Sequence, residues 1–284
     1  MTVMEALQAP ALDPNLRIAK ALRTLREIVL EKGLPATPEE EFKALRERGK
    51  TTTRGNLWKI LLGARQVSCE EYVELVKRGP SACHGKVADD AFRTFASDRH
   101  FTASVTQEQL VRVLNALVHD CQRRSGPAGE VVYVQGMNAI CGLLLTVMNE
   151  LDAFAALAAL AQRHCPLYMC KCLDGVQAAC RLVDEALAHY DPPLAAHLHA
   201  KGLRAHIYAF PWVLSLGTSL PPLSEAARIF DYLLASGVHS IVCIAVARLR
   251  HIRDALLLSS RPMQVALYAA RVRARQAIGV WGGT

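Results

Sequence analysis

Apolar residues recur at helical spacing along most of this chain. Residues three and four positions apart share one side of an α-helix. Strict alternation of apolar and polar residues, which marks half-buried strands, is nearly absent. The pattern predicts an all-α fold. The first apolar face consists of Ile18, Ala21, Leu22, Leu25 and Val29, and it stops at Gly33-Leu34-Pro35.

Capping motifs mark the predicted helix starts. Thr37-Pro38 followed by Glu40 combines an N-cap, a proline at the first helical position and a capping-box acid. This predicts a helix that runs to about Arg48, before Gly49. Two further capping boxes are predicted at Ser68 with Glu71 and at Thr106 with Gln109, the second opening a core helix whose stripe is Leu110, Val113, Leu114 and Leu117.

Further helices are predicted over most of the remaining chain. No fixed repeat of about 20–50 residues is visible, so a solenoid is not expected. The polar breaks at 79–85 and 122–130 are too short for flexible domain linkers, so we expect one continuous helical domain. The predicted ranges are about 131–160, broken or kinked, then 175–188, 194–202, 224–236, 240–258 and 263–277.

Composition and charge exclude several classes of protein. The formal charge is +7 and is scattered, and nucleic-acid motifs are missing, so a nucleic-acid partner is not expected. Nine cysteines, mostly in apolar helical stretches such as those around Cys121, Cys141, Cys180 and Cys243, favour a reducing, cytosolic compartment. The start of the chain lacks the apolar region of a signal peptide.

Two features of the sequence concern possible contact with a membrane. The uncharged ranges 131–149 and 205–224 contain Gln, Asn or Pro residues and are interpreted as buried globular segments, so a transmembrane segment is not expected. Two groups of basic residues are compatible with an acidic partner protein or with peripheral contact to anionic lipid. They are Arg46, Arg48, Lys50 and Arg54 near the start, and Arg271, Arg273 and Arg275 near the end.

A pattern of candidate chemistry begins at Val87, with Asp90, Arg93 and Thr94 spaced along a predicted helix. Asp90 and Arg93 lie one turn apart, so the carboxylate can hold the guanidinium at a set angle. By itself such a pair is more often a solvated surface ion pair.

A second polar cluster, Tyr133-Val134-Gln135-Gly136-Met137-Asn138, lies where a polar loop enters an apolar run. Taken alone, Gln135 and Asn138 could simply satisfy backbone groups at a helix start. Gly136 could likewise serve only close packing.

Together these patterns resemble the TBC-domain activators of Rab GTPases. The family's motifs R-x-x-x-W, I-x-x-D-x-x-R-T and Y-x-Q-G-M-N occur in this order, the first as Arg54 to Trp58, and Val87 replaces the usual Ile. Phe230-Asp231-Tyr232-Leu233-Leu234 resembles a later motif, with Phe230 in place of the commoner Trp. The chain is most similar to the short spindle-checkpoint, or mitotic-exit, branch, and the resemblance covers nearly its whole length.

The resemblance implies a single TBC-type helical domain over residues 1–284 with a shallow partner-binding groove. Residues 1–50 would form N-terminal helices packed on a TBC core of residues 51–284. It also implies a GTPase-activating protein for a Rab-like small GTPase, in which Arg93 neutralises charge on the transferred phosphoryl group and Gln135 orients the water. The supporting or partner-binding residues would be Asp90, Thr94, Tyr133, Gly136, Asn138 and Arg54, with Asp90 bracing Arg93, and with Arg54 and Trp58 mainly structural.

The resemblance also implies partners and places in the cell. GTP and Mg²⁺ would be carried by the GTPase, since the chain has no G-x-x-x-x-G-K-[ST] loop of its own. An accessory scaffold subunit, a cytoplasmic location at the spindle pole, centrosome, basal body or cilium, and roles in the cell cycle or vesicle trafficking are expectations of the same kind. The alternative is a catalytically silent TBC scaffold that binds a GTPase or accessory subunit without accelerating hydrolysis.

Soft metal ligands cluster at His164-Cys165, Cys170 and Cys172, with Cys83-His84 upstream. Their spacing matches no common zinc arrangement, so no metal site is predicted, although one near 164–172 stays open. A cysteine hydrolase is not expected, because none of the cysteines has a local nucleophile motif.

Overall fold

A computed structural model describes residues 14–34, 36–125, 133–219 and 222–269 of the chain. All regular elements in these ranges are helices, so the predicted all-α class is confirmed. The elements up to residue 125 are α2 (Pro14–Lys32), α3 (Pro38–Arg48), α4 (Thr53–Leu62), α5 (Cys69–Lys77), α6 (His84–Arg93), α7 (Arg99–Thr102) and α8 (Gln107–Ser125). From residue 133 they are α9 (Met137–Leu145), α10 (Glu150–Ala159), the π-helical turn η2 (Leu160–His164), the 3₁₀ turn η3 (Pro166–Tyr168), α11 (Asp174–Tyr190), α12 (Pro192–Ala200), α13 (Ala205–Tyr208), α14 (Phe210–Leu214), α15 (Leu223–Ser236), η4 (Val238–Ser240), α16 (Ile241–His251), α17 (Arg253–Leu258) and α18 (Pro262–Ala269).

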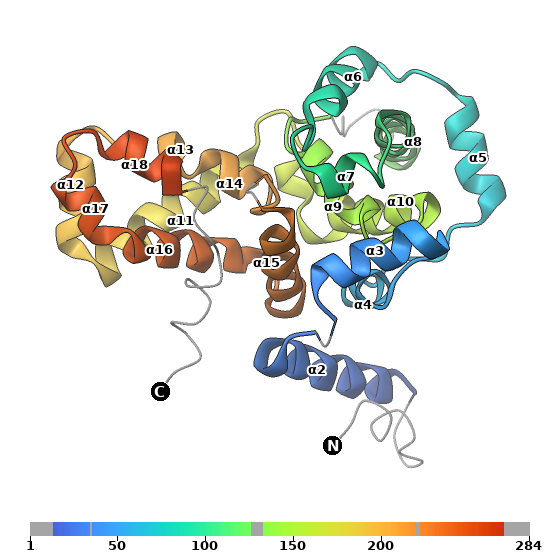
Figure 1. Cartoon of the computed structure of the whole chain (residues 1–284), viewed down its shortest axis with the longest axis horizontal. Coiled ribbons are helices and arrows are strands. Elements are labelled where there is room, and N and C mark those ends of the chain that lie inside the picture. The colour runs from blue at the N-terminus through green and yellow to red at the C-terminus, as the bar shows by residue number, and fades with distance from the viewer. Residues whose placement is uncertain (1–13, 35, 126–132, 220–221, 270–284) are drawn as a thin grey trace.

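The helices form two groups that lie side by side, with α15 between them (Figure 1). In the first group α8 packs against α5, α6, α9 and α10, and in the second α11 packs against α12, α13, α14 and α16. Helix α15 contacts α2, α3, α4 and α9, so it ties the late part of the chain to the early part. Buried apolar side chains accordingly form one continuous cluster that extends from Val29 to Leu256.

The capping motifs behave as predicted at two of three helix starts. The Thr37 side chain accepts from the Glu40 amide, and the Glu40 carboxylate accepts from the Thr37 amide at 2.8 Å. The same reciprocal pair forms between Thr106 and Gln109, at 2.9 and 3.2 Å. At Ser68 the prediction is half wrong. The Glu71 amide donates to Ser68 Oγ, but the Glu71 carboxylate accepts from arginines 65 and 123 instead.

The buried face of α2 differs from the predicted one. Ala21 and Val29 are buried as expected, whereas Ile18 is 53% exposed and Thr24 is buried. Helix α2 packs mainly on α15, which follows it by about two hundred residues. The orientation of α2 is therefore set by that distant partner rather than by its own apolar pattern.

Two long predicted helices are interrupted. The range 131–160 ends one helix at Leu145 and starts another at Glu150, where Asn149 Oδ1 caps the new helix by accepting from the Asp152 amide at 2.9 Å. The range 240–258 breaks at Ile252, between α16 and α17. Of the range 263–277, α18 accounts for residues up to Ala269, and positions 131–132 and 270–277 lie outside the described residues.

The helices described above also concern the predictions about the cysteines and about membrane-spanning segments. All nine cysteines are free thiols, with Cys121, Cys141 and Cys180 buried and Cys243 exposed. Burial raises the pKa of the Cys165 thiol to about 12, which keeps it protonated. His164 Nε2 donates to the Leu62 carbonyl at 3.0 Å, and no three potential ligand side chains converge within the described ranges. None of the helices described here is long and apolar enough to cross a membrane.

Candidate functional site

Helix α6 ends where the first set of candidate residues gathers. Asp90 is buried, whereas the Arg93 side chain one turn later is 57% exposed and donates from Nη2 to Asp90 Oδ1. Thr94 Oγ1 donates to the Asp90 carbonyl at 2.6 Å. Thr94 leaves the helix in an extended conformation, and Phe95 then adopts a left-handed backbone with φ 47°. The guanidinium is thus held at the last turn of α6 on a buried carboxylate.

The second oxygen of Asp90 accepts from a residue of the other motif. Tyr133 Oη donates to Asp90 Oδ2 at 2.6 Å, and the Tyr133 side chain is buried. Burial first, and the hydrogen bond to Asp90 second, raise the pKa of Tyr133 well above its ordinary value. The phenol therefore stays protonated and remains a donor, so Asp90 is fixed from two sides.

The start of α9 adds a third link between the motifs. Asn138 Nδ2 donates to Thr94 Oγ1 at 2.8 Å, and Asn138 Oδ1 accepts from the Gly136 amide at 2.8 Å. Gly136 has φ 109°, a conformation that favours glycine. A Cβ at this position would also lie 3.3 Å from Leu214 Cγ, so the glycine permits close approach of α14.

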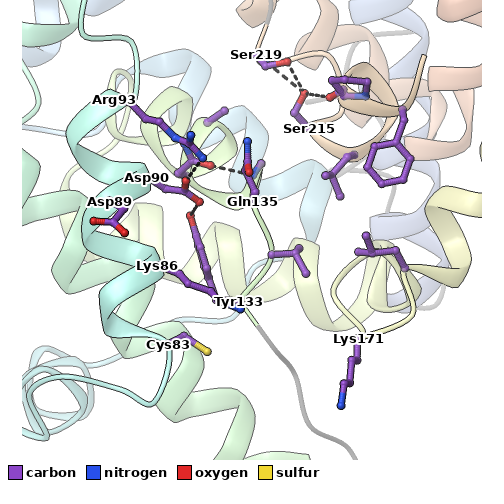
Figure 2. A pocket seen from close by; sticks show the side chains of 18 of the residues that line it. Cys83, Lys86, Asp89, Asp90, Arg93, Tyr133, Gln135, Lys171, Ser215 and Ser219 are labelled. Atoms are coloured by element: carbon purple, nitrogen blue, oxygen red, sulfur yellow. Dashed lines mark hydrogen bonds and ion pairs between the residues drawn. The ribbon is translucent and has the colours of Figure 1, made fainter. Parts of the chain in front are cut away.

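Arg93 and Gln135 line the same cleft, whose volume is about 1040 Å³. Figure 2 shows them on one side of this cleft, with Ser215 and Ser219 across from them. Asp90, Tyr133, Gly136 and Asn138 also line it. The structure thus brings two motifs from separate parts of the chain to one surface and leaves an exposed guanidinium beside an exposed amide.

The opposite wall of the cleft was not predicted from the sequence. It comes from α14 and the residues after it, and the rim carries two further cations, Lys86 and Lys171. The signal in the sequence is the uncharged range 205–224, whose composition indicates burial but does not indicate a site. Its lining residues are Phe210, Pro211, Leu214, Ser215 and Ser219.

Arg54 lies away from the cleft, enclosed between α4 and α15. Its side chain is 2% exposed, and its Nε donates to Asp231 at 3.1 and 3.3 Å. Trp58 Nε1 donates to the same carboxylate at 2.7 Å. The Trp58 ring packs edge-on against Phe230, with 4.9 Å between the ring centroids. Arg54 and Trp58 therefore join α4 to α15, which fits the structural role expected of both.

Comparisons with known proteins agree with the motifs. Residues 51–257 match the model of the family described as RabGAP-TBC, the Rab-GTPase-TBC domain. The chain is 38% identical over 252 residues to the "Putative mitotic check point protein BUB2" of Dictyostelium discoideum, covering 88% of this chain and 65% of that protein. It is 34% identical to "Cell division control protein 16" of Schizosaccharomyces pombe, covering 82% of this chain and 81% of that protein.

Solved structures share the fold. The crystal structure of the Chlamydomonas flagellar RabGAP TBC domain superposes with a TM-score of 0.69 at 22% identity, covering 98% of this chain and 94% of that one. The Ypt/Rab-GAP domain of Gyp1p gives a TM-score of 0.68 at 15% identity, covering 99% and 96%. At these identities the likeness concerns the helical architecture.

Proposed function

Because the chain belongs to the Rab-GTPase-TBC domain family, we propose that it stimulates GTP hydrolysis by a Rab-like small GTPase, with Arg93 and Gln135 inserted in trans. The observation that carries the proposal is that these two exposed side chains, from α6 and from the segment before α9, line one cleft. The small GTPase as partner follows from the family, and the two-finger chemistry is our proposal.

The chemistry of phosphoryl transfer explains why an arginine and a glutamine suffice. The transition state spreads negative charge over the γ-phosphate oxygens and needs a water aligned for in-line attack. The Arg93 guanidinium would neutralise the developing charge, and the Gln135 amide would orient the water. GTP and Mg²⁺ would come with the partner, so this chain would supply no cofactor of its own.

The buried residues below Arg93 would act as positioning residues. Asp90 holds the guanidinium, Tyr133 holds Asp90, and Asn138 links Thr94 to the Gly136 amide. Fixing the side chain before the partner arrives reduces the rotamer entropy lost in the complex. The cations Lys86 and Lys171 on the rim would add attraction for a phosphate-bearing partner.

The names of relatives suggest a setting. Those from Dictyostelium discoideum and Saccharomyces cerevisiae are mitotic check point proteins by name. We therefore also propose a cell-cycle role near the spindle pole or centrosome, with an accessory scaffold subunit that helps to bring the chain to its GTPase. Peripheral membrane contact stays an expectation.

The test is single-turnover GTP hydrolysis by a panel of purified Rab-like GTPases, each with the wild-type chain and with the Arg93→Ala and Gln135→Ala variants. An arginine finger contributes about 10³–10⁵ in rate, so we expect acceleration of at least one GTPase and its near-complete loss in Arg93→Ala. Gln135→Ala should lose most of the acceleration as well. Thermal unfolding of each variant serves as the control for folding.

Two other outcomes would overturn the proposal in different ways. Binding of a GTPase without acceleration by the wild-type chain would identify a catalytically silent scaffold. Acceleration that survives both substitutions would show that the chain activates hydrolysis through other residues.

A further inference from the structure

An exposed aromatic side chain stands directly before the candidate arginine finger. Phe92 is 76% exposed and lies in the last turn of α6, next to Arg93. It is not among the residues that line the cleft, which on α6 include Lys86, Asp89, Asp90 and Arg93. Helical geometry places Phe92 beside that row, on the solvent side of the helix.

The outer face of α6 carries no side chain at one position in line with Phe92. Gly85 lies two turns earlier at the same helical angle, and a Cβ added there would meet no atom within 4 Å. Packing among the residues that the structure describes therefore gives no reason for glycine at that position. A second protein could approach the outer side of α6 closely, with Phe92 as the projecting group.

Single exposed apolar residues are common on protein surfaces and usually need no explanation. The position of Phe92 decides against that interpretation here. A specific interface covers about 800 Å² on each partner, which corresponds to a disc about 16 Å in radius. Neighbouring Cα atoms are about 3.8 Å apart, so a partner whose interface is centred near the Arg93 guanidinium also covers Phe92.

We infer that, provided the chain acts on a small GTPase as proposed above, Phe92 is the apolar anchor that holds the GTPase against α6, inserting into an apolar recess of the partner beside its nucleotide site. Aromatic anchors in desolvated pockets commonly dominate binding energy at interfaces. Phe92 touches no reacting atom in this arrangement. Its contribution is present in the ground state and the transition state alike, so it governs affinity rather than the rate within the complex.

The experiment compares Phe92→Ala with the wild-type chain in two measurements. The first is the Kd for a GTPase loaded with a non-hydrolysable GTP analogue, and the second is the single-turnover hydrolysis rate at saturating chain. We expect Phe92→Ala to raise the Kd about 10- to 30-fold, and to leave the saturating rate within about 2-fold of wild type. Phe92→Leu should recover most of the affinity, because the requirement is for apolar volume.

Tyr190→Ala is the matched control, since Tyr190 is an aromatic residue that is 56% exposed at the far end of α11. It should change neither measurement. An unchanged Kd for Phe92→Ala overturns the inference, and so does a lowered saturating rate at unchanged Kd, which would make Phe92 a positioning residue for Arg93. If the wild-type chain binds a GTPase without accelerating it, the proposed function fails while the Kd comparison still decides the role of Phe92. A chain that binds no GTPase in the panel overturns both.

Discussion

Two buried carboxylates in this molecule each accept from an arginine and from an aromatic side chain, but only one of the two arginines is exposed. Asp90 receives the Arg93 guanidinium and the Tyr133 hydroxyl, and Asp231 receives the Arg54 guanidinium and the Trp58 indole N–H. The difference lies in the arginines, because the Arg93 side chain is 57% exposed and that of Arg54 is 2% exposed. The Arg93 guanidinium, held by Asp90, is thus open to a partner. The Arg54 guanidinium, held by Asp231, is enclosed and links α4 to α15.

The comparison teaches that residue type and spacing do not assign a role by themselves. Both arginines belong to motifs that the sequence marks with equal clarity. The difference arises because α15 packs over α4 and encloses Arg54, whereas Arg93 stays exposed at the end of α6. Three substitutions test how far the contrast holds.

The largest expected effect on stability is that of Arg54→Ala. Removal of the guanidinium leaves Asp231 buried without its charge partner, which typically costs about 3–5 kcal/mol of unfolding free energy. Urea titration followed by circular dichroism measures the change. Arg93→Ala is the matched control and should cost about 1 kcal/mol or less, because water from the cleft can replace a half-exposed guanidinium. Equal losses for both variants would remove the distinction between the clusters.

Trp58→Phe removes the aromatic donor of the enclosed cluster. The ring is fully buried, and its Nε1 donates to Asp231 Oδ1 at 2.7 Å, so the substitution leaves a cavity and removes one of the two donors to that oxygen, the other being Arg54 Nε. We expect a loss of roughly 2–4 kcal/mol in unfolding free energy. Any GTPase stimulation should persist at temperatures where the variant remains folded. A selective loss of stimulation in the folded variant would contradict the purely structural role of this cluster.

Tyr133→Phe makes the corresponding change beside Asp90 and should have the smallest effect on stability of these three substitutions. The ring is retained and only the hydroxyl is lost, so we expect about 1–2 kcal/mol. Stimulation of hydrolysis should fall about tenfold, because Asp90 would lose one of the two contacts that fix it. Single-turnover rates and thermal unfolding of the same preparation measure both quantities. A variant with wild-type rates would show that Asp90 needs no support from Tyr133 to hold Arg93.

Local features of the fold followed from the sequence, and features set by distant neighbours did not. The pairing of Asp90 with Arg93 depends on one helical turn, so the spacing alone predicted it. The capping box at Thr37 is equally local. At Ser68 the box is incomplete because arginines 65 and 123 take the Glu71 carboxylate. A motif of four residues cannot show that an arginine from another helix, Arg123 of α8, will bind its carboxylate.

The cleft shows the same division. The side formed by α6 and the segment before α9 carries the recognisable motifs, whereas the wall from α14 carries none. Leu214 lines the site from α14, and Gly136 permits its close approach to the start of α9. Similarly, the buried face of α2 is chosen by α15, so Thr24 is buried although Ile18 is the more apolar residue.

The link between α4 and α15 also orders events during synthesis. Arg54 and Asp231 are separated by 177 positions along the chain. At about 5–20 residues per second, roughly 9–35 s pass between their emergence from the ribosome. Throughout that interval Arg54 and Trp58 lack their carboxylate, and the apolar surface that α15 will cover stays open to chaperones and to other nascent chains. The N-terminal group of helices is therefore completed only after the C-terminal part of the chain has been made.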